Sequence, residues 1–60
     1  MALSRKHYEM VAAALKDTLE VDSNNRAAVA YLTGKFIVEF SDDNPRFDSE
    51  RFVKATGLAG

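Results

Sequence analysis

The sequence predicts a small all-α domain, and three observations carry this prediction. The chain has 60 residues, enough for one domain. Two long segments repeat apolar residues at the spacing of a helix, and the turn residues 22–25 (Asp-Ser-Asn-Asn) separate them. A third, shorter segment has clear helix start and stop signals. We therefore expect a single domain over residues 1–60, in which an antiparallel helical hairpin (about 5–21 and 25–41) is joined by a short third helix (about 49–56).

The first predicted helix is amphipathic. Ser4 is a good N-cap residue, and Leu3 and Tyr8 have the spacing of a hydrophobic staple around it. On a helical wheel, one stripe collects the larger apolar residues Tyr8, Val11, Leu15 and Leu19. We expect this stripe to face the core.

The same helix is charged against its own dipole. It begins with Arg5, Lys6 and His7, and it has Asp17 and Glu20 near its end. A helix dipole favours the opposite arrangement. In an antiparallel hairpin the basic start lies beside the acidic end of the second helix, so we expect it to be compensated there by Glu39, Asp42 and Asp43.

The second predicted helix is apolar on two sides. One side, the expected mate of the first helix, holds Val29, Leu32, Phe36 and Phe40, and Thr33 falls in a polar strip. A helix with two apolar sides is expected to pack against other protein surface on both sides. The opposite side is therefore the candidate association face, and it consists of Ala27, Ala30, Tyr31, Gly34, Ile37 and Val38.

The third predicted helix has the strongest local signals. Asp48 is an N-cap residue flanked by Phe47 and Phe52, which form a second staple. Gly57 suits the left-handed position after a helix, and Leu58 follows it as in a Schellman motif. These signals fix both ends of a short helix.

The length of this helix limits what it covers. Eight residues span about 12 Å, whereas the second helix is about 25 Å long. We expect Phe47, Phe52 and Leu58 to cover part of the second face and to leave the surroundings of Tyr31 exposed. Three covers for this exposed part of the second helix remain open: a second copy of the chain, the rest of this chain, or another protein.

The small size of the chain asks for an additional source of stability. A domain of this length buries only about 60% of the surface of its unfolded chain. The chain has no Cys and a single His, His7, and it lacks a calcium-binding loop motif, so we expect no disulfide, metal or cofactor. Association with another chain is the remaining source of stability, and we expect a homodimer that forms a dimeric helical bundle.

Composition and motifs argue against several function classes. The net charge of −1 disfavours nucleic acid as a partner, and no apolar run is long enough to span a membrane. Ser4, His7, Tyr8 and Tyr31 have no catalytic spacing, so we expect neither enzymatic activity nor a small-molecule substrate.

One alternative function stays open, that of a small DNA-binding regulator. The segments 25–41 and 49–56 would form a helix-turn-helix, with Arg46, Arg51 and Lys54 directed at the duplex. The connection is long for that motif, and acidic residues surround the three basic ones.

Two segments carry a resemblance to a known group of proteins. Residues 4–8 (Ser-Arg-Lys-His-Tyr) and 43–52 (Asp-Asn-Pro-Arg-Phe-Asp-Ser-Glu-Arg-Phe) resemble the short uncharacterised proteins encoded by phages of actinobacteria. Many of these open with Ser-Arg-x-x-aromatic and close with Asp-Asn-Pro-Arg-Phe-Asp followed by Arg and Phe. The ending 54–60 is longer than the ending typical of that group.

The resemblance implies a phage origin and a location in the cytoplasm of a bacterial host, and it transfers no catalytic or binding residue. Together with the two-sided second helix, it leads us to expect a self-associating protein–protein interaction module that can also bind a host protein.

Overall fold

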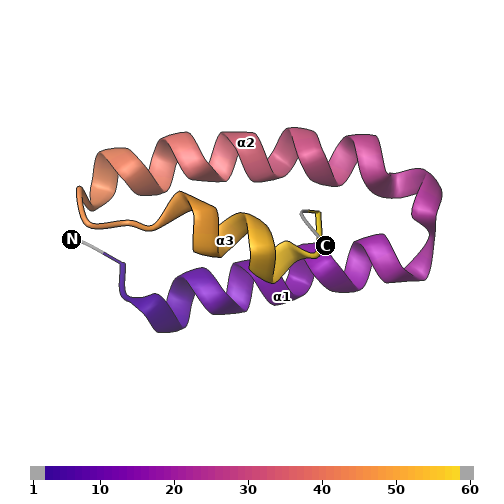
Figure 1. Cartoon of the computed structure of the whole chain (residues 1–60), viewed down its shortest axis with the longest axis horizontal. Helices are drawn as coiled ribbons and strands as arrows, with labels where there is room; N and C mark the ends of the chain where they lie inside the picture. The colour runs from indigo at the N-terminus through magenta and orange to yellow at the C-terminus, as the bar shows by residue number, and fades with distance from the viewer. Residues whose placement is uncertain (1–2, 59–60) are drawn as a thin grey trace.

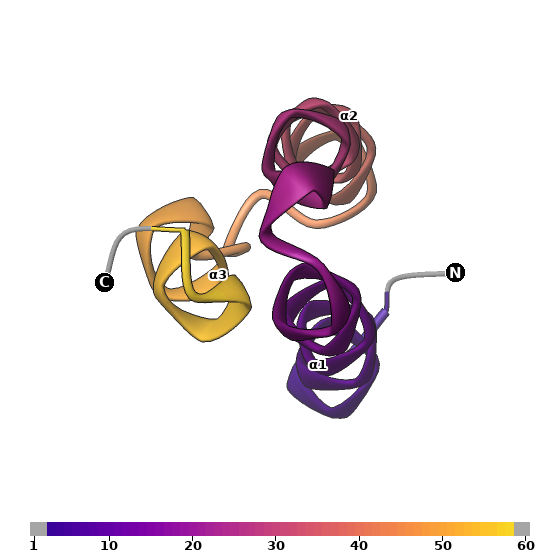
Figure 2. The same ribbon diagram turned by 90° about the vertical axis from the view of Figure 1, so that its right-hand side faces the viewer.

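The computed structural model describes residues 3–58, which form three α-helices and one short 3-10 turn. In chain order these are α1 (Arg5–Val21), η1 (Ser23–Asn25), α2 (Arg26–Asp43) and α3 (Ser49–Thr56). The helices α1 and α2 run antiparallel, and α3 lies beside both (Figure 1). Viewed along the long axis, the three helices form a triangle (Figure 2).

The all-α prediction is confirmed, and residues 3–58 contain no strand. The predicted bounds of α1 and α3 agree with the structure. The helix α2 begins one residue later and ends two residues later than the predicted 25–41, because η1 takes up the end of the turn and the chain stays helical as far as the residue before Asn44-Pro45.

The start of α1 is held by hydrogen bonds rather than by ion pairs. The Nδ1 atom of His7 accepts a hydrogen bond from the Ser4 N–H at 3.1 Å, which is the role of Glu or Gln in a capping box. The Leu3 N–H donates to Oδ2 of Asp43 at 2.7 Å and joins this start to the end of α2. Among residues 3–58 no ion pair within 4.0 Å connects the basic start of α1 to α2, and of the acidic residues expected beside this start it is Asp43 that makes a contact, through its hydrogen bond to Leu3.

The core lies between the three helices. Its buried apolar residues are Ala12, Leu15, Val29, Phe40 and Phe52. The ring of Phe40 is its centre, because the ring centroids of Tyr8, Phe47 and Phe52 lie 4.8, 5.4 and 5.5 Å from it. Such tilted and edge-on aromatic contacts add to the free energy gained from burial.

The helix α3 fills the groove between α1 and α2. Phe52 is buried, and Phe47 and Leu58 are half-buried against the core. These three residues find more apolar surface to bury in the groove, where two helices contribute to it. Of the second face of α2, Ile37 is half-buried against the core, whereas Tyr31 and Val38 stay exposed, so most of that face is left uncovered.

Both ends of α3 are tied down. At its start, Oδ1 of Asp48 accepts the N–H of Arg51 at 3.0 Å, as an N-cap should. Beyond its end, Gly57 has a φ of 84°, and Arg26 of α2 donates through Nη2 to the Leu58 carbonyl at 2.9 Å. The start of the third helix is thus capped locally, and the segment after its end is bonded to α2.

The hydroxyl of Thr56 completes the C-terminus of α3. It donates to the Val53 carbonyl at 2.6 Å and lies 3.3 Å from the Leu58 N–H, which donates to it. This hydroxyl takes the place of the direct bond between Leu58 and Val53 that a Schellman motif would contain.

The helix α2 is rotated about its axis relative to the prediction. Thr33 is only 2% exposed, whereas Leu32 is 44% exposed. A single partner helix would have left Thr33 at the edge of the contact. Because α2 packs on both α1 and α3, its buried side is centred on Val29, Thr33 and Phe40.

The two buried threonines allow a paired test of this packing. The Thr33 hydroxyl is buried without a hydrogen-bond partner in residues 3–58. A buried hydroxyl of this kind costs free energy, so Thr33→Val should raise the free energy of unfolding by about 1 kcal/mol. Thr56→Val should lower it by about 1–3 kcal/mol, because two bonded groups lose their partner. Urea denaturation of both variants measures the two values, and equal signs would contradict the assigned hydrogen bonds.

Candidate protein interaction face

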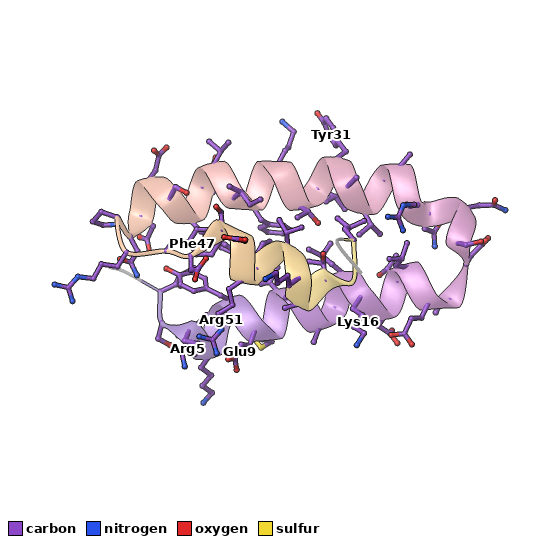
Figure 3. The ribbon with its side chains drawn as sticks, in the orientation of Figure 1. Arg5, Glu9, Lys16, Tyr31, Phe47 and Arg51 are labelled. Carbon is purple, nitrogen blue, oxygen red and sulfur yellow. The ribbon has the colours of Figure 1, made fainter. Side chains whose placement is uncertain are left out.

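The side of α2 that faces away from the core is apolar and exposed. Tyr31 and Val38 are 65% and 59% exposed, and Tyr31 points away from α1 and α3 (Figure 3). We refer to the exposed apolar and small residues of this side as the α2 outer face, and they are Ala27, Ala30, Tyr31, Gly34 and Val38.

Five of the six residues of the predicted association face lie on the α2 outer face. Ile37 does not, because it is half-buried and packs against the core. The rotation of α2 that buries Thr33 also draws Ile37 inward. It moves Leu32 in the opposite direction, from its predicted place in the core to the border of the exposed side.

Gly34 lies in the middle of α2, and nothing within this chain requires a glycine there. A Cβ atom built at this position would have no neighbour within 4 Å. The backbone is also ordinary, since Gly57 is the only glycine with positive φ among the described residues. A mid-helix glycine costs about 1 kcal/mol relative to alanine. Within a single copy, Gly34 therefore costs stability without any structural gain.

Tyr31 is held in place on this face by its neighbour on the next turn. The Nζ atom of Lys35 lies 5.2 Å from the centroid of the Tyr31 ring, at the distance of a cation–π contact. Tyrosine is common in protein interfaces because its ring buries apolar area while its hydroxyl stays hydrogen-bonded. A ring that is already positioned loses less conformational entropy on binding.

The molecule as a whole exposes much surface for its mass. Its accessible surface is 4369 Å², against about 3,900 Å² for a typical monomer of the same mass. Part of the excess comes from its elongated shape, with extents of 33 × 18 × 18 Å. The exposed side of α2 runs along the longest of these dimensions (Figure 1).

The candidate catalytic residues considered from the sequence do not gather into one site. Oγ of Ser4 and Nδ1 of His7 lie 3.0 Å apart, but this pair is exposed and belongs to the cap of α1. The Tyr8 hydroxyl is buried, and Tyr31 lies on the α2 outer face.

Neither a metal-binding cluster nor a membrane-spanning helix is present among the described residues. In residues 3–58 no group of three or more His, Cys, Asp or Glu side chains is placed to hold a metal ion. None of the described helices has the length and apolar character needed to cross a membrane.

No family model, no curated protein sequence and no solved structure matches this chain.

Alanine substitution should have opposite effects at Gly34, within α2, and at Gly57, just beyond the end of α3. At protein concentrations low enough to keep the chain monomeric, Gly34→Ala should raise the free energy of unfolding by about 1 kcal/mol, because alanine is the better helix former. Gly57→Ala should lower it by about 1 kcal/mol, because an alanine is strained at positive φ. Chemical denaturation of dilute samples measures both. A loss of stability in dilute Gly34→Ala would mean that the glycine is needed within one copy.

Proposed function

We propose that this chain is a small helical protein–protein interaction module, and that it self-associates through the α2 outer face into a dimeric helical bundle. The observation that carries the proposal is Gly34, which is unfavourable within one copy and has open space around it. A glycine on an exposed apolar helix face allows the backbone of another molecule to approach closely.

The size of the core supports the same proposal. Among the described residues only five apolar side chains are buried, and one of them is an alanine. A core this small rarely supplies more than about 3–5 kcal/mol of stability. A partner that binds only the folded state adds to this stability by mass action.

A symmetric dimer fits the shape of the face. Two copies of α2 that cross antiparallel near Gly34 would place Tyr31 of one copy opposite Val38 of the other. The same contact would then occur twice, which is the arrangement of a two-fold symmetric interface. The small side chains of Ala27 and Ala30 would leave room for the second helix.

The biological setting is proposed from the sequence resemblance. Residues 4–8 and 43–52 resemble short phage proteins of actinobacterial hosts, and we propose a phage protein that acts in the host cytoplasm. In that setting, a host protein is a further candidate partner for the module.

Sedimentation equilibrium tests self-association directly. We expect a dimer at micromolar concentration. Gly34→Arg should weaken it by about tenfold or more, because the long charged side chain prevents the close approach of the helices. Lys16→Glu is the control, since Lys16 lies on α1, away from Tyr31 (Figure 3), and this variant should leave the dimer intact.

Two results would contradict the proposal. One is a wild-type chain that is stably folded and monomeric throughout the concentration range. The other is an equal effect of the two substitutions, which would mean that the α2 outer face is not the interface. Circular dichroism of both variants separates lost association from lost folding.

A further inference from the structure

A hollow of about 370 Å³ lies away from the α2 outer face, between α1, α3 and the segment that connects α2 to α3. Its apolar lining includes Tyr8, Phe47 and the buried Phe52. Three exposed arginines also line it, and they come from three different segments: Arg5 from α1, Arg46 from the connection and Arg51 from α3. We refer to this site as the arginine hollow.

The three guanidinium groups have no acidic partner within the described chain. In residues 3–58 no ion pair within 4.0 Å involves them. The hydrogen bonds that Arg46 and Arg51 make come from their backbone N–H groups, to Asn44 at 3.0 Å and to Asp48 at 3.0 Å. Their side chains therefore retain their donors for a group outside this chain.

The helix ends at this end of the molecule carry charges of both signs. Both α1 and α3 begin there and α2 ends there (Figure 1), and a helix carries about half a positive charge at its start and half a negative charge at its end. The first turn of α1 contains no acidic residue, whereas the first turn of α3 contains Glu50. The positive potential beside the hollow therefore comes mainly from the start of α1 and from the arginines themselves.

Two carboxylates moderate this potential. Asp48 lines the hollow, and it caps α3. Glu9 lies beside Arg5 and Arg51 (Figure 3). With two acids among three arginines, the lining keeps a small positive charge and suits one or two negative charges.

Tyr8 contributes apolar surface to this wall. Its ring packs against Phe40 and Phe47, and its hydroxyl is buried without a hydrogen-bond partner in residues 3–58. A ligand that enters beside these rings would meet an apolar wall.

We propose that the arginine hollow binds an acidic peptide segment of a partner protein, with an apolar side chain against the aromatic rings and a carboxylate paired by Arg5 and Arg51. A carboxylate matches the planar guanidinium group through paired hydrogen bonds. The volume suits one or two side chains rather than a bare ion. Because the α2 outer face lies elsewhere, a dimer formed through α2 keeps both hollows available.

The test is an NMR titration of the full ¹⁵N-labelled chain with four acetylated tetrapeptides. Each places one apolar residue (Leu, Ile, Phe or Tyr) between glutamates, and each has a matched peptide with glutamine in place of glutamate. We expect saturable shifts at Tyr8, Arg51 and Phe52 with the acidic peptides, and about tenfold weaker binding of the glutamine peptides.

Three variants assign the binding to individual residues. Arg51→Gln should weaken it about tenfold through the loss of a charge-assisted hydrogen bond. Lys54→Gln removes the same charge from the same helix outside the arginine hollow, and it should change the affinity by less than about twofold. Glu9→Gln should strengthen binding, because it removes a negative charge that repels the carboxylates of the peptide.

Four outcomes would overturn this proposal. One is the absence of saturable shifts with all four acidic peptides. Another is an equal effect of Arg51→Gln and Lys54→Gln, which would show attraction by net charge alone. A third is an equal affinity for inorganic phosphate, which would make the hollow a simple anion site. The last is a dimer weakened by Arg51→Gln as by Gly34→Arg, which would place the hollow in the self-association interface. Binding that persists in Gly34→Arg separates this proposal from that of the dimer.

Discussion

The packing of aromatic rings around Phe40 is the contact on which the rest of the structure depends. Phe40 contributes from α2, Tyr8 from α1, and Phe47 and Phe52 from the last part of the chain. This cluster brings α3 into the groove between the first two helices. Without it, α1 and α2 would form an isolated hairpin with one shared face, and the domain would lose much of its small core.

The docking of α3 also determines which side of α2 remains exposed. A helix with apolar residues on two sides has no single preferred rotation, so its neighbours decide how it sits. Contact with two helices turns Thr33 and Ile37 inward and Leu32 outward. The same rotation leaves Tyr31, Gly34 and Val38 on the surface. The docking of α3 therefore determines both the internal packing of α2 and the surface proposed as the interface.

The sequence predicts the local features well, because their causes lie within a few residues. The ends of α3 follow from Asp48, from the Phe47–Phe52 pair and from the backbone freedom of Gly57. The rotation of α2 depends on which helix packs where, and the apolar pattern of α2 alone favours no single answer. Most of the candidate association face was predictable, with Ile37 misplaced for this reason.

The arginine hollow was not predictable in this way. Arg5 is distant in sequence from Arg46 and Arg51, and only the docking of α3 brings the three together. The sequence contains one signal, a basic first turn on α1 that opposes the helix dipole.

The hydrogen bond between Arg26 and the Leu58 carbonyl affects how the whole domain opens. It acts with the aromatic cluster to hold both α3 and the segment after it against α2, which opposes fraying of α3 from its C-terminal end. The three helices should open and close as one cooperative unit, and amide hydrogens of α3 would exchange only with those of the core.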